Sequence, residues 1–229
     1  MGERRVLLLN FKNYREVLGA KAIELARMAE RVSSVVDPEV IVAPPTSMIG
    51  VIASSVKIPV FSQKVEVGEV GQSTGALIPE SVRAAGAAGS ILNHSEARAS
   101  YSDLSELVPR LRSLGLEVCL CARSAREVRK LAPLSPHYLA VEPPELIGTG
   151  IPVSKARPEL IENSVKAARS VGYRGRILCG AGISRGEDVR KGVELGADGV
   201  LVASAVVKAR NWMGKITELA LALHPSRNP

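Results

Sequence analysis

A short apolar run in the second half of the chain, His137-Tyr138-Leu139-Ala140-Val141, ends at the carboxylate of Glu142 and continues as Pro143-Pro144-Glu145-Leu146-Ile147-Gly148-Thr149-Gly150. The run predicts a buried strand with an acidic side chain at its tip. Two prolines stiffen the following segment and two glycines loosen its far end, as is typical of a lid over a catalytic group. The alternative is a solvated glutamate before a proline-rich turn, which is commoner for an isolated Glu-Pro-Pro. The rest of the chain has to decide between them.

Seven other runs of the same kind occur along the chain, so the sequence predicts eight strands. They lie at Val6–Asn10, Val40–Ala43, Val60–Ser62, Gly89–Asn93, Glu117–Cys121, Tyr138–Val141, Arg176–Cys179 and Gly199–Val202. The runs are mostly continuous in apolar residues instead of alternating with polar ones. This pattern is typical of parallel strands that are buried on both faces.

Helical patterns lie between these strands. The clearest are Lys21–Val35, Asp103–Ser113 with Ser102 as its expected N-cap, Pro158–Val171, Glu187–Leu195 and Trp212–Leu223. Eight strands alternating with about eight helices predict an α/β fold, the (β/α)8 TIM barrel, and residues 1–229 are expected to form one domain. An open doubly wound sheet is the alternative. It is disfavoured because Asn10-Phe11-Lys12-Asn13 follows the first strand where that fold would carry Gly-x-Gly-x-x-Gly.

Composition narrows the functional classes. The chain has 229 residues, 46% hydrophobic and 23% charged, which is typical of a globular protein. Its net charge of +7 suits nucleic acid or small phosphorylated metabolites, but the basic residues are scattered and lack interleaved aromatics, so no nucleic-acid partner is expected. No apolar run approaches the roughly 20 residues of a membrane span, and the first residues lack a signal-peptide pattern. We therefore expect no membrane partner and a cytoplasmic location.

Cysteine usage agrees with that location. The chain has three cysteines, and Cys119 and Cys121 share one face of a predicted strand. Without a neighbouring histidine or further cysteine, core packing is favoured over metal binding. Nothing in this pattern requires an oxidising compartment.

Polar side chains follow three of the predicted strands, where barrel active sites are built. The first strand ends at Asn10-Phe11-Lys12, the fourth at Asn93-His94-Ser95-Glu96 and the sixth at Glu142. His94 precedes a predicted helix start, where backbone N–H groups disfavour a charged imidazole, so it is expected to be neutral. Each group alone has a structural or solvated alternative. A base, a neutral histidine and a lysine at one barrel mouth together favour catalysis.

Small residues follow the last two strands. They are Cys179-Gly180-Ala181-Gly182-Ile183-Ser184 and Val202-Ala203-Ser204-Ala205, and the second leads into a short predicted helix. Such turns let backbone N–H groups approach an anion, and barrels often bind phosphate at this position. Glycine-rich turns also arise for steric reasons alone.

Taken together, these pieces resemble the triosephosphate isomerase family. The matching segments are Asn10-x-Lys12, Asn93-His94-Ser95-Glu96, the Glu142–Gly150 segment and the turns after the last two strands, in family order. The resemblance implies interconversion of dihydroxyacetone phosphate and D-glyceraldehyde 3-phosphate through an enediolate, in glycolysis and gluconeogenesis. It implies a small phosphorylated triose as substrate and neither a metal nor an organic cofactor.

The resemblance also implies residue roles. Glu142 would move a proton between two substrate carbons, His94 would polarise the carbonyl, and Lys12 would stabilise the enediolate and help to hold the phosphate. Glu96 would be a supporting carboxylate. The remaining substrate-binding candidates are Asn10, Ile147 or Gly148 of the lid, Gly182, Ala203 and Ser204.

Departures from the common family pattern point to its archaeal branch. Glu145 stands where a tryptophan is common in the lid, and Asn93 where a glycine precedes the histidine. Cys179-Gly180-Ala181-Gly182 replaces Tyr-Gly-Gly-Ser, so a hydroxyl contact to phosphate is lost, and Ala203-Ser204 replaces a glycine pair.

A long loop follows the third strand, from about residue 65 to 78, and such loops usually have a function. In this family the loop reaches into a neighbouring subunit. The resemblance therefore implies at least a dimer, with Thr74 near the partner's site, and its archaeal character favours a homotetramer.

Two other functions remain as alternatives. One is a different phosphate-binding barrel enzyme, such as a synthase that acts on a sugar phosphate. The other is a regulatory barrel that binds phosphate without catalysis. The presence of Lys12, His94 and Glu142 together disfavours both.

Overall fold

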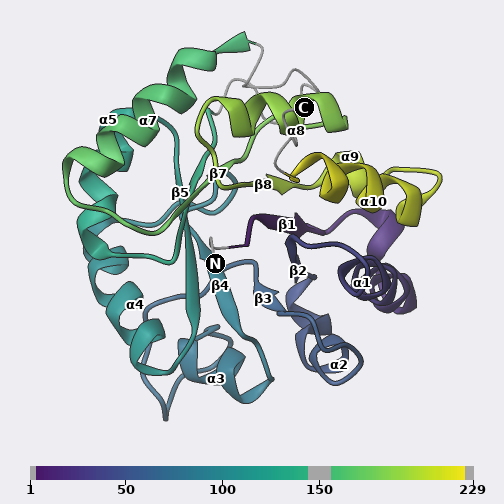
Figure 1. The fold of residues 1–229 in the computed structure, drawn as a ribbon. Helices are drawn as coiled ribbons and strands as arrows, with labels where there is room; N and C mark the ends of the chain where they lie inside the picture. The colour runs from purple at the N-terminus through teal and green to yellow at the C-terminus, as the bar shows by residue number, and fades with distance from the viewer. Residues whose placement is uncertain (1–3, 144–155, 225–229) are drawn as a thin grey trace.

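The computed structural model describes residues 4–143 and 156–224, and eight parallel strands form one sheet within them (Figure 1). The strands are β1 (Val6–Asn10), β2 (Glu39–Ala43), β3 (Phe61–Ser62), β4 (Gly89–Leu92), β5 (Glu117–Ala122), β6 (Tyr138–Val141), β7 (Arg176–Cys179) and β8 (Gly199–Val202). All eight predicted strands are confirmed, four of them with the predicted bounds. The remaining four differ by one residue at one end.

The sheet curls into a barrel. Its order is β2-β1-β8-β7-β6-β5-β4-β3, so strands adjacent in the chain are adjacent in space and β1 lies beside β8. Between β2 and β3, a parallel bridge joins Val42 to Val60, and the Val42 backbone N–H donates to the Pro59 carbonyl at 3.0 Å. The TIM-barrel prediction is confirmed. The doubly wound alternative is wrong, because an open sheet would not bring its first and last strands together.

Helices surround the barrel (Figure 1). They are α1 (Ala20–Ser33), α2 (Ile49–Ala53), α3 (Pro79–Ala84), α4 (Tyr101–Ser113), α5 (Ala125–Leu131), α7 (Pro158–Ser170), α8 (Gly186–Glu194), α9 (Ser204–Val207) and α10 (Trp212–Ala222), with short 3-10 turns at Arg15–Val17, Thr46–Met48 and Ala132–Leu134. No helix in the described part of the chain is both long and apolar enough to cross a membrane.

The predicted N-cap of α4 is wrong. The helix begins at Tyr101 and its cap is Ser100, whose hydroxyl accepts from the Asp103 backbone N–H at 3.1 Å. The Asp103 carboxylate accepts in return from the Ser100 backbone N–H, completing a capping box. Both serines precede Asp103, but only Ser100 stands three residues before it, so the reciprocal geometry selects the earlier one.

Successive side chains of each strand point to opposite faces of the sheet, and so the apolar residues form two layers. One layer fills the barrel and includes Leu8, Ile41, Phe61, Tyr138 and Leu201, while the other packs between the strands and the helices. Cys119 and Cys121 belong to the barrel interior and Cys179 to the outer layer. All three are buried free thiols, as core packing predicted. The filled interior leaves the rim of the barrel as the place for polar chemistry.

Candidate active site

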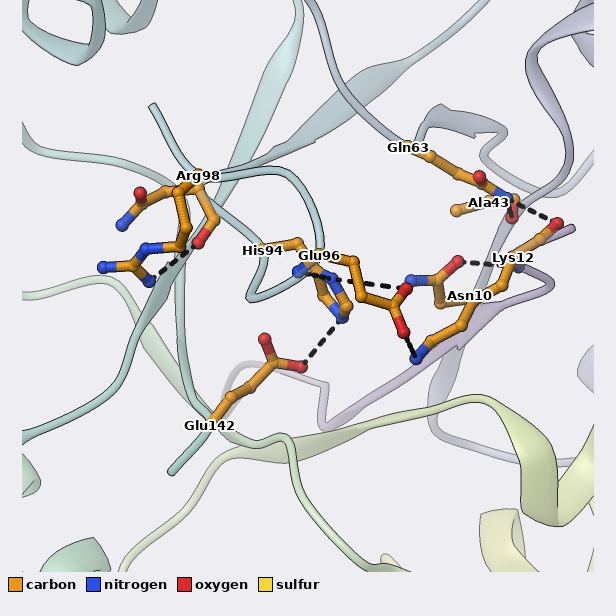
Figure 2. A network of polar contacts seen from close by, with 9 residues as sticks. Asn10, Lys12, Ala43, Gln63, His94, Glu96, Arg98 and Glu142 are labelled. Atoms are coloured by element: carbon orange, nitrogen blue, oxygen red, sulfur yellow. Dashed lines mark hydrogen bonds and ion pairs between the residues drawn. The ribbon is translucent and has the colours of Figure 1, made fainter. Parts of the chain in front are cut away.

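Lys12, His94 and Glu142 meet at the carboxyl ends of β1, β4 and β6 (Figure 2). The His94 Nε2 atom lies 3.6 Å from Glu142 Oε1, and the Lys12 Nζ atom lies 2.8 Å from Glu96 Oε1. The four groups come from three segments that are far apart in the sequence, since His94 and Glu96 share one. Parallel strands bring them to one mouth because their carboxyl ends share one rim.

Lys12 is held in a conformation that non-glycine residues rarely adopt. Its backbone φ is 48°, in the left-handed region. Its backbone N–H donates to the Asn10 side-chain oxygen at 2.9 Å, and the Gln63 amide donates to the Lys12 carbonyl at 3.0 Å and to the Ala43 carbonyl at 3.1 Å. These contacts fix the direction of the lysine side chain. Asn10, predicted to touch substrate, therefore also shapes the turn below it.

His94 follows Asn93, which has a left-handed φ of 58°. The Glu96 backbone N–H donates to His94 Nδ1 at 3.1 Å, so the ring proton of a neutral imidazole resides on Nε2, the atom that faces Glu142. Burial, with a smaller contribution from the Lys12 ammonium, lowers the pKa of His94 to about 4. A turn, and not the expected helix start, supplies the N–H group, because α4 begins only at Tyr101.

A second set of contacts fixes the backbone around His94. The Asn93 amide donates to the Cys121 carbonyl at 2.8 Å, which ties the end of β4 to β5. Arg98 donates to the Asn93 carbonyl at 3.1 Å and also pairs with Glu127 of α5. These contacts hold the turn that carries the imidazole, and Asn93 helps to position His94 in this way.

Glu142 is a buried carboxylate with one free oxygen. Its backbone N–H donates to the Ala122 carbonyl at 2.8 Å, which continues the β6–β5 ladder by one residue. The residue is 3% exposed, and Oε2 has no hydrogen-bond partner within the described residues. Burial raises the pKa of Glu142 to about 7, although the Cys121 thiol and the Lys12 ammonium act in the opposite direction. A carboxylate at this pKa can both take and return a proton near neutral pH.

Gly180 makes room for this carboxylate. A Cβ atom at position 180 would lie 2.5 Å from Glu142 Cγ and 3.1 Å from its Oε1. The Gly180 backbone N–H also donates to the Val141 carbonyl at 3.0 Å, so the backbone cannot retreat without loss of that bond. Glycine is therefore required here by the packing of the side chain across from it.

The mouth contains two neighbouring cavities. One of about 380 Å³ is lined by Lys12, His94 and Glu142 and by residues 180–184 and 201–205. A second, of about 480 Å³, shares Lys12, Tyr14 and His94 and extends toward Gln63 and Glu96. The predicted phosphate residues Gly182, Ala203 and Ser204 all line the first cavity. The same cavity therefore contains the reacting groups and the candidate anion-binding turns.

The sequence analysis missed two polar residues that line the first cavity, Tyr14 and Lys208. The Lys208 Nζ atom lies 4.7 Å from the centroid of the Tyr14 ring, and the lysine has no ion pair within the described residues. Lys12, by contrast, is paired with Glu96. The sequence spacing could have indicated Lys208. It stands four residues after Ser204, and residues four apart lie on the same face of a helix.

Pro144, Glu145 and the predicted lid residues Ile147–Gly150 lie outside the described residues. Within residues 4–143 and 156–224, no group of three or more His, Cys, Asp or Glu side chains is arranged to hold a metal ion.

A buried carboxylate, a neutral imidazole and an ammonium group beside candidate anion-binding turns are the kinds of group that proton transfer next to a carbonyl requires. Comparison with known proteins specifies the class further. The triosephosphate isomerase family model matches residues 5–220. Triosephosphate isomerases from Archaeoglobus fulgidus, Methanothermus fervidus and Methanocaldococcus jannaschii are 47%, 44% and 42% identical to this chain, over 96%, 95% and 93% of it and 98% of each relative. The chain belongs to the triosephosphate isomerase family and is an isomerase.

Proposed function

We propose that Glu142 is the base with which this isomerase interconverts dihydroxyacetone phosphate and D-glyceraldehyde 3-phosphate. The supporting observation is the Glu142 carboxylate itself. It is buried, its Oε2 has no partner among the described residues, and it lies 3.6 Å from a neutral imidazole. The carbon acid beside a carbonyl is weak, so a base and an electrophile must act together. This reaction would serve glycolysis and gluconeogenesis.

The proton follows a defined route in this proposal. Glu142 takes a proton from the carbon next to the carbonyl and returns it to the neighbouring carbon. His94 donates its Nε2 hydrogen toward the substrate oxygens as negative charge grows there, and Lys12 stabilises the same charge. Glu96 supports Lys12 through the 2.8 Å contact. The residues can do this without a metal or an organic cofactor.

The substrate phosphate would lie at the other side of the cavity. Gly182, Ala203 and Ser204 are proposed to offer backbone N–H groups, as are Ile147 or Gly148 of the lid, and Asn10 positions the lysine turn. Lys208 is added to this set because it lines the cavity and has no described carboxylate partner. It would compensate for the hydroxyl contact that this chain lacks in the turn after β7.

Self-association is part of the proposal. Residues 71–75 of the loop after β3 are exposed, and Val67 and Val70 of that loop are 42% and 71% exposed. Apolar side chains on a long loop are typical of a contact surface. We infer a dimer or homotetramer in which this loop, with Thr74, reaches a partner's site. We further infer that residues 1–229 act as one domain, in the cytoplasm, without nucleic-acid or membrane partners.

A coupled assay with glyceraldehyde 3-phosphate tests the proposal. Glu142→Gln and His94→Gln should each lower kcat by about 10²- to 10⁴-fold. The first variant loses the group that transfers the proton, and the second loses the group that polarises the carbonyl. Glu162→Gln and His224→Gln are matched controls on exposed positions and should retain wild-type turnover. Exchange of the substrate's carbon-bound hydrogen with deuterated water should fall with kcat in Glu142→Gln. Wild-type turnover in that variant would refute the assignment of the base.

A further inference from the structure

A third cavity lies at the opposite end of the barrel from the candidate active site. Its volume is about 390 Å³, and it is lined by Arg112 and by residues 135–137 and 172–176. Residues 135–137 precede β6, and residues 172–175 precede β7. The cavity therefore opens at the amino ends of the two strands whose carboxyl ends lead to Glu142 and Gly180. It shares no lining residue with the two cavities of the active-site mouth.

Positive charge dominates this cavity. Arg112, Arg174 and Arg176 line it together with His137, and no carboxylate from the described part of the chain does. Arg174 is exposed and makes no hydrogen bond or ion pair within the described residues. Arg112 uses only Nη1, which donates to the Ser135 carbonyl at 2.9 Å. Most of the donors of two guanidinium groups therefore remain available to a ligand.

The nearby carboxylates are occupied elsewhere. Glu39 pairs with Arg176 Nη1 at 2.9 Å. Glu117 accepts from the Tyr138 hydroxyl at 2.9 Å. Asp198 accepts from the Ile177 backbone N–H at 2.8 Å. Each of these acids already has a partner, so Arg112 and Arg174 lack a counter-ion from the described part of the chain.

His137 adds a directed donor to the two arginines. Its Nδ1 accepts from the Val118 backbone N–H at 3.1 Å, which assigns the hydrogen of the neutral ring to Nε2. Burial lowers the pKa of His137, in agreement with a neutral ring. Nε2 makes no hydrogen bond within the described residues and is not among their buried unpartnered atoms, so it is open to solvent.

We propose that this cavity is an anion site for a phosphoryl group, bound by Arg112, Arg174 and His137. A guanidinium group can donate two parallel hydrogen bonds to two oxygens of a phosphate, and a neutral imidazole N–H supplies a further donor. The volume lies within the range of small-molecule sites and exceeds the needs of inorganic phosphate alone. The ligand would be either free phosphate or a small phosphate monoester.

The three histidines of the chain make the test specific to each site. Histidine-labelled protein is titrated with inorganic phosphate and followed by two-dimensional NMR of the imidazole signals. The His94 signal reports the active-site mouth, His137 the new cavity, and His224 general ionic effects. We expect the His137 signal to shift along a saturating curve, while a chloride titration of equal ionic strength leaves it nearly unchanged.

Substitutions link the shift to the cavity. Arg174→Ala should weaken phosphate binding at His137 about tenfold or more and leave the His94 titration unaltered. Arg31→Ala, an exposed arginine at the end of α1, is the matched control and should behave as wild type. Arg112→Ala provides a second test of the cavity if Arg174→Ala does not fold.

The outcomes separate cleanly. A His137 signal that does not shift, or that follows chloride as it follows phosphate, would overturn the proposal, as would unchanged affinity in both arginine variants. A repeat with glycerol 2-phosphate identifies the source of the phosphoryl group. Tighter binding of the ester supports a metabolite site, and equal binding supports a site for free phosphate.

Discussion

The Glu142 carboxylate sits in a place that water barely reaches, and this determines when it can act as a base. Burial raises its pKa to about 7, whereas His94 has a pKa of about 4 and stays neutral throughout the working range. The deprotonated carboxylate is the active form. Activity should therefore be present above pH 7 and be lost as the pH falls through 7.

The pH profile of kcat/KM checks this expectation. The acid limb should have a midpoint near pH 7 and a slope of one, because one group of the free enzyme titrates there. A midpoint near 4.5, the ordinary value for a glutamate, would mean that Glu142 is solvated in the free enzyme. The substrate's own ionisation must be followed separately by NMR.

A second prediction at this scale concerns Gly180. Gly180→Ala would place a methyl group 2.5 Å from Glu142 Cγ and so displace the carboxylate. We expect kcat to fall about 10²-fold, since displacements near 1 Å have effects of that size on positioned groups. Gly50→Ala is the control, because its added Cβ meets only the Ala85 carbonyl at 3.8 Å. Equal kcat in the two variants would contradict the argument.

The residue scale also shows what sequence reasoning could reach. Lys12, His94 and Glu142 stand within two residues of the strand ends, so their place at the rim was predictable from the strand pattern alone. Gln63 and Lys208 were not, because their contacts depend on which side chains of neighbouring strands and helices face them. The sequence pattern predicts where a strand ends, but it does not predict the rotamer of a side chain next to that end.

At the scale of elements, α9 brings several phosphate candidates together. This four-residue helix begins at Ser204, and Lys208 stands at its C-cap beside the same cavity. The first N–H groups of a helix lack intrahelical acceptors, so those of Ser204 and Ala205 are available to an anion. The lysine ammonium, stacked on Tyr14, adds a full charge to these dipoles.

Lys208→Ala should therefore raise KM for glyceraldehyde 3-phosphate about tenfold and change kcat little, because the phosphate does not react. Unphosphorylated glyceraldehyde should be turned over equally by both proteins. Lys191→Ala, on the exposed face of α8, is the matched control. If Lys208→Ala lowers kcat for both substrates alike, the lysine acts on the chemistry and not on the phosphate.

Elements were predicted more accurately in their cores than at their ends. The bounds of β1, β6, β7 and β8 were predicted because each of these strands coincides with a short, mainly apolar run of the sequence. The cap of α4 was assigned to Ser102 instead of Ser100, since two serines compete there and only the reciprocal bond with Asp103 decides. Element ends depend on single hydrogen bonds, whereas element cores depend on many apolar contacts.

At the scale of the whole molecule, the loop after β3 leads to a prediction about assembly. Val70 is 71% exposed in the single chain, so a charge there should leave the fold intact. Val70→Arg should nevertheless reduce the mass measured by light scattering from that of a dimer or tetramer, and reduce activity with it. Val35→Arg, at an 80% exposed position after α1, should change neither. A wild-type chain that is fully active as a monomer would reject the proposed assembly.

The closed barrel was predictable at this scale because eight alternations of strand and helix leave few arrangements. The basic cavity at its amino end was not, because Arg112, Arg174 and His137 lie in separate connections whose approach depends on the curvature of the sheet. Sequence patterns identify the topology. The surfaces formed between loops arise only once the barrel has closed.

The three buried thiols can report how often the strands that carry them open. Cys119 and Cys121 lie on β5, Cys179 lies on β7, and burial raises the pKa of Cys179 to about 12. An alkylating reagent can reach them only when these strands separate from their neighbours. The rate at which the chain gains the mass of the alkyl group would therefore measure the rate of opening. Mass analysis of peptides from β5 and β7 would show whether these two strands open together or one before the other.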